Sequence, residues 1–226
     1  MNKNSRKEKH KSKTFKKDIS KIDSMNLITR IKQTPYALKK YGIKSFAYNA
    51  ISIAISDVVI VSFQKCGKTW LRVMLSKILE KKYDIKKVNL DLQFMTLFKR
   101  HAPNILITHA GSTKDNNKIN FRKVFKNKKI IFLVRDPRDS VVSLYHSART
   151  REKIYDKDDI SEFIHNPSCG LPKIINFMND WAQEMNSRPQ DFLLVRYEDL
   201  KIDTKKQLTH LLQFINIDAS EELINP

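Results

Sequence analysis

The chain has 226 residues, of which 41% are hydrophobic and 30% charged, and its formal net charge is +19 at pH 7. This length and composition suffice for one domain with a substantial core, and they exclude a low-complexity or fibrous chain. The two cysteines, Cys66 and Cys169, provide neither a disulfide framework nor a zinc-ligand spacing. This cysteine usage predicts a reducing compartment, and we expect a cytoplasmic protein.

The positive charge is concentrated at the start of the chain. Residues 1–44 hold 14 Lys or Arg and 3 acidic residues, a net charge of +11. We predict a basic tail and a leading helix over 1–44, and one α/β domain over 45–226. Such a tail can contact an anionic membrane surface or a polyanion. Contact with a membrane would place the protein at the membrane periphery. No nucleic-acid-binding module is recognisable, so specific nucleic-acid binding is not expected.

The first half of the domain begins with alternating helical and extended patterns. Residues 25–55 predict one or two helices interrupted near Pro35. The apolar, β-branched run Val58–Phe63 predicts a buried strand, and a helical apolar pattern then continues to about Lys82. A further helix is expected around Leu90–Phe98. Because the apolar segment Phe46–Phe63 changes from a helical to an extended pattern midway, we interpret it as a helix and a strand rather than a membrane span.

The second half predicts a parallel sheet. Strands are expected at Ile105–Thr108, Lys129–Val134 and Phe192–Arg196. Helices are expected from Pro137 to about Arg149, from Lys173 to Met185, and from Lys205 to Ile215. Strands that alternate with helices predict an α/β fold of three layers, with a central, mostly parallel sheet flanked by helices. Ligands bind beyond the carboxyl ends of the strands in such sheets. The residues at or just after predicted strand ends are Lys65, His109, Arg135 and Tyr197.

An anion-binding loop is expected between the first strand and the first helix of the domain. A helix start presents unpaired N–H groups and a positive dipole end, and Lys65 and Lys68 add cationic charge there. The segment from Ser62 to Thr69 fits the P-loop pattern G-x-x-x-x-G-K-T except at its first position. The residues alone therefore predict an oxyanion site and leave open whether it holds a phosphate or a sulfate.

Three segments carry a family resemblance. Phe63–Trp70 resembles the 5′-phosphosulfate loop (Tyr-Pro-Lys-Ser-Gly-Thr-Thr-Trp) of sulfotransferases that use 3′-phosphoadenosine 5′-phosphosulfate (PAPS). Arg135–His146 is similar to the 3′-phosphate motif of that family, and Arg196–Leu200 is similar to its Arg-Tyr-Glu-Asp-Leu segment. The motifs occur in family order, and the resemblance extends from about Asp57 to Ile224. The resemblance implies a P-loop-like fold, which agrees with the α/β pattern of the predicted elements.

The resemblance also implies roles. Lys65 would stabilise charge on the transferred sulfuryl group and on the leaving oxygen, and His109 would be the general base. The donor would be PAPS and the product PAP, with no metal required. The acceptor would be a hydroxyl group of a carbohydrate or glycolipid, with a small alcohol or phenol left open. The cofactor-binding residues would be Lys65, Cys66, Gly67, Lys68, Thr69, Trp70, Arg135, Ser143 and Tyr197.

The sequence departs from the family pattern at several places. Gln64 replaces a proline and Cys66 a serine, and Lys68 introduces a charge where animal cytosolic enzymes have threonine. Family members usually continue to a basic Arg-Lys-Gly segment that closes over the cofactor, and no such segment occurs before Pro226. This departure leaves three interpretations open: a truncated chain, another mode of closure, or an inactive protein.

Other interpretations of the same residues also remain open at this stage. The first is a P-loop nucleotide kinase or NTPase, and the second is a degenerate, non-catalytic sulfotransferase-like protein that binds a polyanion. Arg135 could instead be an ion-pair partner of Asp136 or Asp139. Trp70 could belong to the core, as we expect for Trp181.

Overall fold

The computed structural model describes residues 51–85, 91–97, 99, 101–112, 124–152, 155–156 and 158–224. The chain divides into two units between Ile55 and Ser56, and each is described by itself. In the first unit, residues 51–55 are helical. The predicted basic tail and the helices expected before residue 51 lie outside the described residues. No helix within the described ranges is long and apolar enough to cross a membrane.

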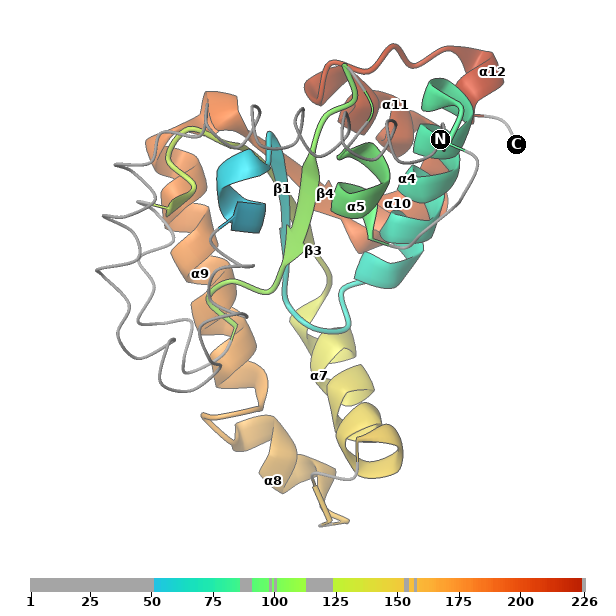
Figure 1. Ribbon diagram of the computed structural model, residues 1–226. Helices are drawn as coiled ribbons and strands as arrows, with labels where there is room; N and C mark the ends of the chain where they lie inside the picture. The colour runs from blue at the N-terminus through green and yellow to red at the C-terminus, as the bar shows by residue number, and fades with distance from the viewer. Residues whose placement is uncertain are drawn as a thin grey trace, which may run out of the picture. The chain divides into compact units, whose positions relative to one another are not determined.

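The second unit contains a four-stranded sheet in the order β2-β1-β3-β4, and every strand pair is parallel (Figure 1). The prediction of an α/β fold with a parallel sheet is therefore confirmed. Strands β2, β3 and β4 have the predicted bounds, whereas β1 ends one residue earlier than predicted. The bounds are β1 Val58–Ser62, β2 Ile105–Thr108, β3 Lys129–Val134 and β4 Phe192–Arg196. Because all four strands run the same way, their carboxyl ends share one edge.

Among the described residues of the second unit, helices follow β1, β3 and β4. Their bounds are α4 Lys68–Tyr83, α5 Leu92–Thr96, α7 Pro137–His146, α8 Ile160–His165, α9 Leu171–Ser187, α10 Tyr197–Ile202, α11 Thr204–Phe214 and α12 Glu221–Ile224. A 3₁₀ turn, η3, spans Pro189–Asp191, and a π-helix, η2, spans Ser147–Arg151. The sequence did not predict α8, α10 or α12.

The ends of several helices follow from local side-chain chemistry. The Asp91 side chain accepts a hydrogen bond from the backbone N–H of Phe94, which begins α5 inside the predicted range. Pro172 lies in the first turn of α9, where a proline loses no helical hydrogen bond, so this helix begins before the predicted Lys173. The helix predicted to end near Arg149 changes to π-helical hydrogen bonding after His146.

Helices cover both faces of the sheet, with α9 on one face and α4 and α11 on the other (Figure 1). On the α4 side, alternate strand residues such as Ile60 and Ile131 join leucines of α4 and α11 in one core cluster. On the α9 side, Phe132 packs against Phe177 and Trp181, with ring centroids 6.2 and 6.3 Å apart. Trp181 has no exposed surface, which confirms its predicted place in the core.

The core tryptophan also holds the segment after β2. The indole N–H of Trp181 donates to the carbonyl oxygen of Ala110 at 3.0 Å. Buried polar groups are costly unless they are paired, so this bond favours one position of the backbone next to His109. A core residue thereby positions a predicted site residue at the carboxyl edge of the sheet.

Candidate functional site

The loop between β1 and α4 has an unusual backbone. Lys65 and Gly67 both have positive φ angles, 65° and 85°. Glycine adopts this region freely, whereas a residue with a side chain pays about 1–2 kcal/mol. Gly67 is the N-cap of α4, and its carbonyl oxygen accepts a hydrogen bond from Leu71 N at 3.1 Å. The loop therefore turns sharply into the positive end of a helix of 16 residues, as an anion site requires.

Gly67 lies directly against Tyr197, the first residue of α10. A Cβ atom built on Gly67 would lie 2.3 Å from Cδ2 of the tyrosine ring. The loop and the Arg-Tyr-Glu-Asp-Leu segment are therefore in contact, and only glycine allows this approach without displacement of the ring.

We expect Gly67→Ala to destabilise the protein by at least about 1–2 kcal/mol, because alanine is strained at this φ and its Cβ also meets the ring. Urea unfolding measures the free energy of unfolding of this variant, of Tyr197→Ala and of the double variant. Since Tyr197→Ala removes the ring and leaves the φ strain, the double variant should lose less than the sum of the single changes. Strict additivity would show that the ring contact carries no energy.

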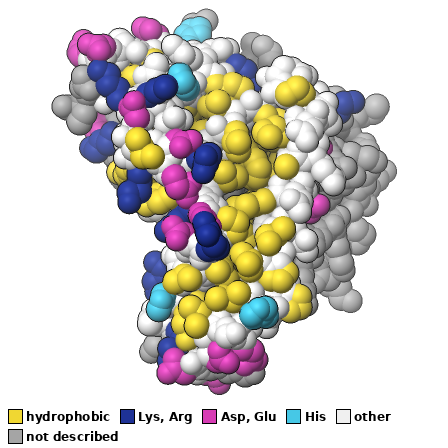
Figure 2. Space-filling model, turned by 180° about the vertical axis from the view of Figure 1, so that it is seen from behind, with side chains coloured by type: hydrophobic (Ala, Val, Ile, Leu, Met, Phe, Trp, Pro, Cys, Tyr) yellow, Lys and Arg dark blue, Asp and Glu magenta, His cyan; other side chains and the backbone are white. Residues whose placement is uncertain are grey.

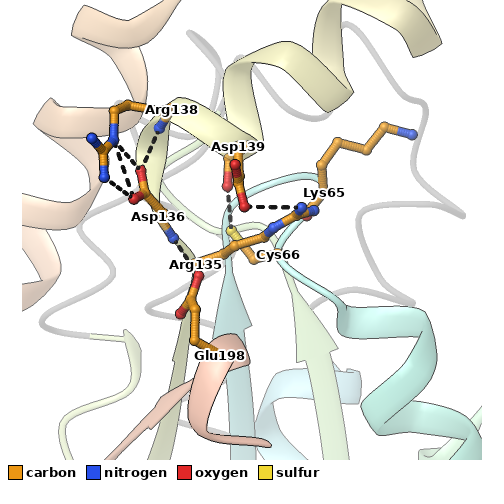
Figure 3. Close-up of polar contacts among 8 residues, drawn as sticks. Lys65, Cys66, Arg135, Asp136, Arg138, Asp139 and Glu198 are labelled. Atoms are coloured by element: carbon orange, nitrogen blue, oxygen red, sulfur yellow. Dashed lines mark hydrogen bonds and ion pairs between the residues drawn. The ribbon is translucent and has the colours of Figure 1, made fainter. Parts of the chain in front are cut away.

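Arg135 joins the two anion motifs (Figure 3). Its Nη1 donates to the carbonyl oxygen of Lys65 at 3.1 Å, and its Nη2 lies 3.4 Å from a carboxylate oxygen of Asp139. Its guanidinium carbon is 4.8 Å from the centre of the Tyr197 ring. Its Nε is buried and has no hydrogen-bond partner among the described residues. The arginine thus retains a donor that a bound anion could engage.

Two aromatic side chains stand beside this arginine. Trp70 and Tyr197 meet edge to face, with ring centroids 5.8 Å apart. Trp70 is 36% exposed, so the interpretation of Trp70 as a core residue is wrong. An exposed indole next to a tyrosine and a guanidinium offers a surface on which a planar base could stack. A role in adenine binding remains a prediction for both aromatic residues.

The start of α7 is fixed by charged side chains. Asp136 caps this helix by accepting from the N–H of Arg138, and the Arg138 guanidinium pairs with the same carboxylate at 2.6 Å. Hydrogen bonds from Arg138 lower the pKa of Asp136 to about 2. Two ion-pair partners were considered for Arg135. Asp139 is confirmed as its partner, whereas the carboxylate of Asp136 pairs with Arg138 instead.

Glu198 ties the second and third motifs together. One of its carboxylate oxygens accepts a hydrogen bond from the backbone N–H of Asp136 at 2.9 Å (Figure 3). This bond joins the end of β3 to α10 and fixes the residue that follows Arg135.

We expect Glu198→Ala to lower the free energy of unfolding by about 1 kcal/mol, because it leaves a half-buried N–H without its acceptor. Glu198→Gln is the matched control, since its amide oxygen can accept the same bond, and its stability should stay near that of the wild type. Thermal unfolding of both variants makes the comparison. Equal losses in the two variants would show that charge, and not the hydrogen bond, holds this junction.

The side chain of Cys66 connects the loop between β1 and α4 to α7. Its Sγ lies 3.6 Å from the hydroxyl oxygen of Ser140 on α7, and both residues have no exposed surface. Burial raises the pKa of the thiol, against a smaller opposing effect of the Ser140 hydrogen bond. The side chain therefore packs the loop against α7, and any contribution of Cys66 to cofactor binding would come from its backbone.

His109 and Lys68 form the second cluster of the site. The register of β1 and β2 pairs Val61 with Thr108, and the ring Nδ1 of His109 lies 2.8 Å from the carbonyl oxygen of Ser62. The other ring nitrogen, Nε2, is hydrogen-bonded to the Lys68 ammonium. Burial and the nearby Lys68 charge lower the pKa of His109. Burial, followed by repulsion from Arg72, lowers the pKa of Lys68 to about 8.

The remaining predicted site residues have fewer contacts. The Lys65 side chain leads away from the Arg135 cluster in Figure 3 and makes no hydrogen bond or ion pair within the described part of the chain. Burial and repulsion from Arg151 lower its pKa. Ser143 is half-buried on α7, and Thr69 is exposed at the start of α4. The structure shows no contact that joins Ser143 to Arg135 among the residues that it describes.

Four supporting residues were not among the predicted site residues. Ser140, Asp139 and Glu198 lie inside the quoted motifs. The partners of Ser140 and Glu198 depend on the fold, whereas Asp139 pairs with Arg135 four residues before it. Arg72 could have been found from its spacing, because it lies four residues after Lys68 and thus on the same face of α4.

Comparisons with known proteins agree on one family. The model of the sulfotransferase domain family matches residues 55–226. Mouse sulfotransferase 2B1 is 23% identical over 215 residues, which cover 87% of this chain and 61% of the relative. Mouse sulfotransferase 6B1 is 27% identical over 206 residues, covering 84% and 65%. The chain thus spans less than two thirds of the length of these relatives.

Solved structures show the same fold. The crystal structure of mouse sulfotransferase SULT7A1 complexed with PAP superposes with a TM-score of 0.53 at 20% identity, over 75% of this chain and 61% of that one. The sulfotransferase domain of the Synechococcus PCC 7002 olefin synthase gives a TM-score of 0.51 at 19% identity, over 75% and 76%. At this identity the likeness supports the fold alone.

Proposed function

The chain belongs to the sulfotransferase domain family, and on that premise we propose that it transfers a sulfuryl group from PAPS to an acceptor hydroxyl and releases PAP. The observation that carries the proposal is the hydrogen bond from Arg135 Nη1 to the carbonyl oxygen of Lys65. It joins a helix-start anion loop to a second cationic group at the same edge of the sheet. A donor with two anionic ends needs such a pair of sites.

The residues present fit this donor. PAPS, when bound, supplies a sulfuryl group already activated by its attachment to a phosphate. The loop at Gly67 and the positive end of α4 would hold the 5′ end, and Arg135, with an unpaired buried Nε, would hold the 3′-phosphate together with Ser143. Trp70 and Tyr197 would contact the adenine. These residues bind and orient the donor, which supplies much of the rate enhancement in transfers of this kind.

Two side chains would take part in the transfer itself. The Lys65 ammonium would stabilise charge on the transferred group and on the leaving oxygen. His109 would accept the acceptor hydroxyl proton at Nε2, because its Nδ1 is hydrogen-bonded to Ser62 O and thereby carries the ring proton. Lowering of the His109 pKa by burial favours the neutral ring, which is the form that acts as a base.

This proposal predicts the pH profile. Because the pKa of His109 is lowered from its ordinary value of 6.5, the ring should stay neutral to below that pH. Activity should therefore be retained as the pH falls to 6.5 and should be lost below it, as the ring becomes protonated. The acidic limb of log kcat/KM for PAPS against pH measures this directly, because it reports the donor-free enzyme. A limb centred above pH 6.5 would contradict the role of His109 as a buried base.

The nucleotide kinase or NTPase interpretation has less support. The first glycine of the P-loop pattern is replaced by Ser62 in this chain. Family membership also favours a sulfuryl donor over a nucleoside triphosphate.

A carbohydrate or a glycolipid is the acceptor that we propose. Figure 2 shows hydrophobic side chains gathered in a band that is bordered by charged groups. Exposed large hydrophobic residues include Val142 on α7, Ile175 on α9 and Leu194 on β4. Contiguous apolar surface on a soluble domain often marks an interaction site, and here it supports an acceptor with a lipid part.

The proposed activity is tested with ³⁵S-labelled PAPS and three acceptors: a glycolipid in detergent micelles, its deacylated headgroup, and 4-nitrophenol. We expect labelled product from the glycolipid, with a higher kcat/KM than from the headgroup. Product from 4-nitrophenol alone would support the proposed sulfuryl transfer but would show that the acceptor is a phenol and not a carbohydrate or glycolipid. PAP binding without transfer to any of the three would favour the non-catalytic, polyanion-binding interpretation.

A further inference from the structure

Both ring nitrogens of His109 are engaged in the structure. Nδ1 faces the carbonyl oxygen of Ser62 at 2.8 Å, which requires that Nδ1 carry the proton. Nε2 is then the only ring atom with a lone pair, and it is hydrogen-bonded to the Lys68 ammonium. The atom that would accept the proton from the acceptor is therefore occupied by a lysine from the anion loop.

The partner of Lys68 is a poor one for a cation. A neutral imidazole accepts a hydrogen bond but provides no compensating charge, and a second cation, Arg72, repels the positive charge of both Lys68 and His109. Lys68 is also the first residue of α4, so the positive end of that helix lies at its own backbone. An ammonium bonded to a phosphate gains both a charge-assisted hydrogen bond and the opposite charge that a neutral ring lacks. An anion bound at this helix start would therefore compete well for the ammonium.

We propose that Lys68 is a donor-responsive positioning residue, which covers Nε2 of His109 in the donor-free protein and turns to the anionic 5′ end of the donor when it binds. This inference rests on the proposed function, namely a donor in the loop and His109 as the base. Nε2 becomes free for an acceptor hydroxyl only after the donor has bound. The arrangement orders the two substrates.

The test is an NMR titration of His109 in the full chain, with and without saturating PAP as the probe. The signal is assigned with His109→Gln. The variants are Lys68→Met, which removes the ammonium, and Lys77→Met, an exposed change on the same helix as the matched control. PAP brings negative charge to every variant, so the comparison between variants isolates the contribution of Lys68.

Three results are expected. Without PAP, the pKa of His109 should be higher in Lys68→Met than in the wild type by about 1 unit, because a nearby like charge has been removed. PAP should raise the pKa of His109 in the wild type and in Lys77→Met. The rise in Lys68→Met should be smaller, because no ammonium remains to be displaced.

Two outcomes would overturn the inference. The first is an unchanged pKa of His109 in donor-free Lys68→Met, and the second is an equal response to PAP in the wild type and in that variant. A failure of the proposed function is distinguishable from both, because the thermal unfolding temperature of every variant would then not change with PAP. The inference about Lys68 would then fail together with the proposed function, whatever the pKa values of His109 without PAP.

Discussion

Lys65→Met is expected to lower kcat for sulfuryl transfer by about 10²–10³-fold, the usual cost of removing one preorganised group that stabilises charge in the transition state. The Lys65 ammonium makes no hydrogen bond or ion pair within the described residues, and the residue is held at a φ of 65° in the anion loop. PAP binding should weaken far less, because Arg135 and the start of α4 remain. Initial rates with ³⁵S-labelled PAPS, together with calorimetric titration of PAP, measure both effects.

Lys77→Met is the matched control for this change, because Lys77 is an exposed lysine on α4 whose recorded partner is Glu80. It should keep full activity. The assignment of Lys65 would be wrong if Lys65→Met kept wild-type kcat, whether or not its KM for PAPS rose. An unchanged kcat with a raised KM would indicate uniform binding of the donor rather than stabilisation of the transition state.

His109→Ala is expected to lower kcat by about 10²–10⁴-fold, the range typical of a lost general base. The ring is oriented by Ser62 O, and its neutral form is favoured by burial, so its removal should also abolish the acidic limb of the pH profile. The measurement is kcat/KM against pH for the wild type and the variant. Added imidazole should restore part of the rate if the cavity admits it.

His210→Ala serves as the control, because His210 is an exposed residue of α11 with no hydrogen bond among the residues that the structure describes. Its rates should match those of the wild type. A His109→Ala variant with an intact acidic limb would assign that limb to another group, and the base would have to be sought elsewhere.

Much of the sheet could be predicted because its strands are continuous apolar runs between polar residues. The continuous apolar run of Lys129–Val134 is typical of a buried parallel strand, and both faces of this strand are buried in the structure. Short helices could not be predicted in the same way. Helix α10 begins at Tyr197 directly after β4, and its N-cap, Arg196, makes no side-chain capping bond that would mark the start.

The site could be predicted only as far as its motifs reach. Lys65 and Arg135 follow strand ends, so their approach at one edge of the sheet could be anticipated. The pairing of Lys68 with His109 could not, because it depends on the register of β1 and β2 and on the rotation of α4. The sequence likewise could not predict that Arg135 bonds to Lys65 O, whereas Ser143 makes no such contact within the described residues.

The measurement that tests the account most directly is calorimetric binding of PAP and AMP, which differ only in the 3′-phosphate, with ATP and Mg²⁺ as a third ligand. One or more charge-assisted hydrogen bonds from Arg135 should make PAP bind roughly 10- to 100-fold more tightly than AMP. Arg135→Met should abolish that preference. Equal affinities for PAP and AMP, or a Mg²⁺-dependent preference for ATP, would contradict a PAPS site in this fold.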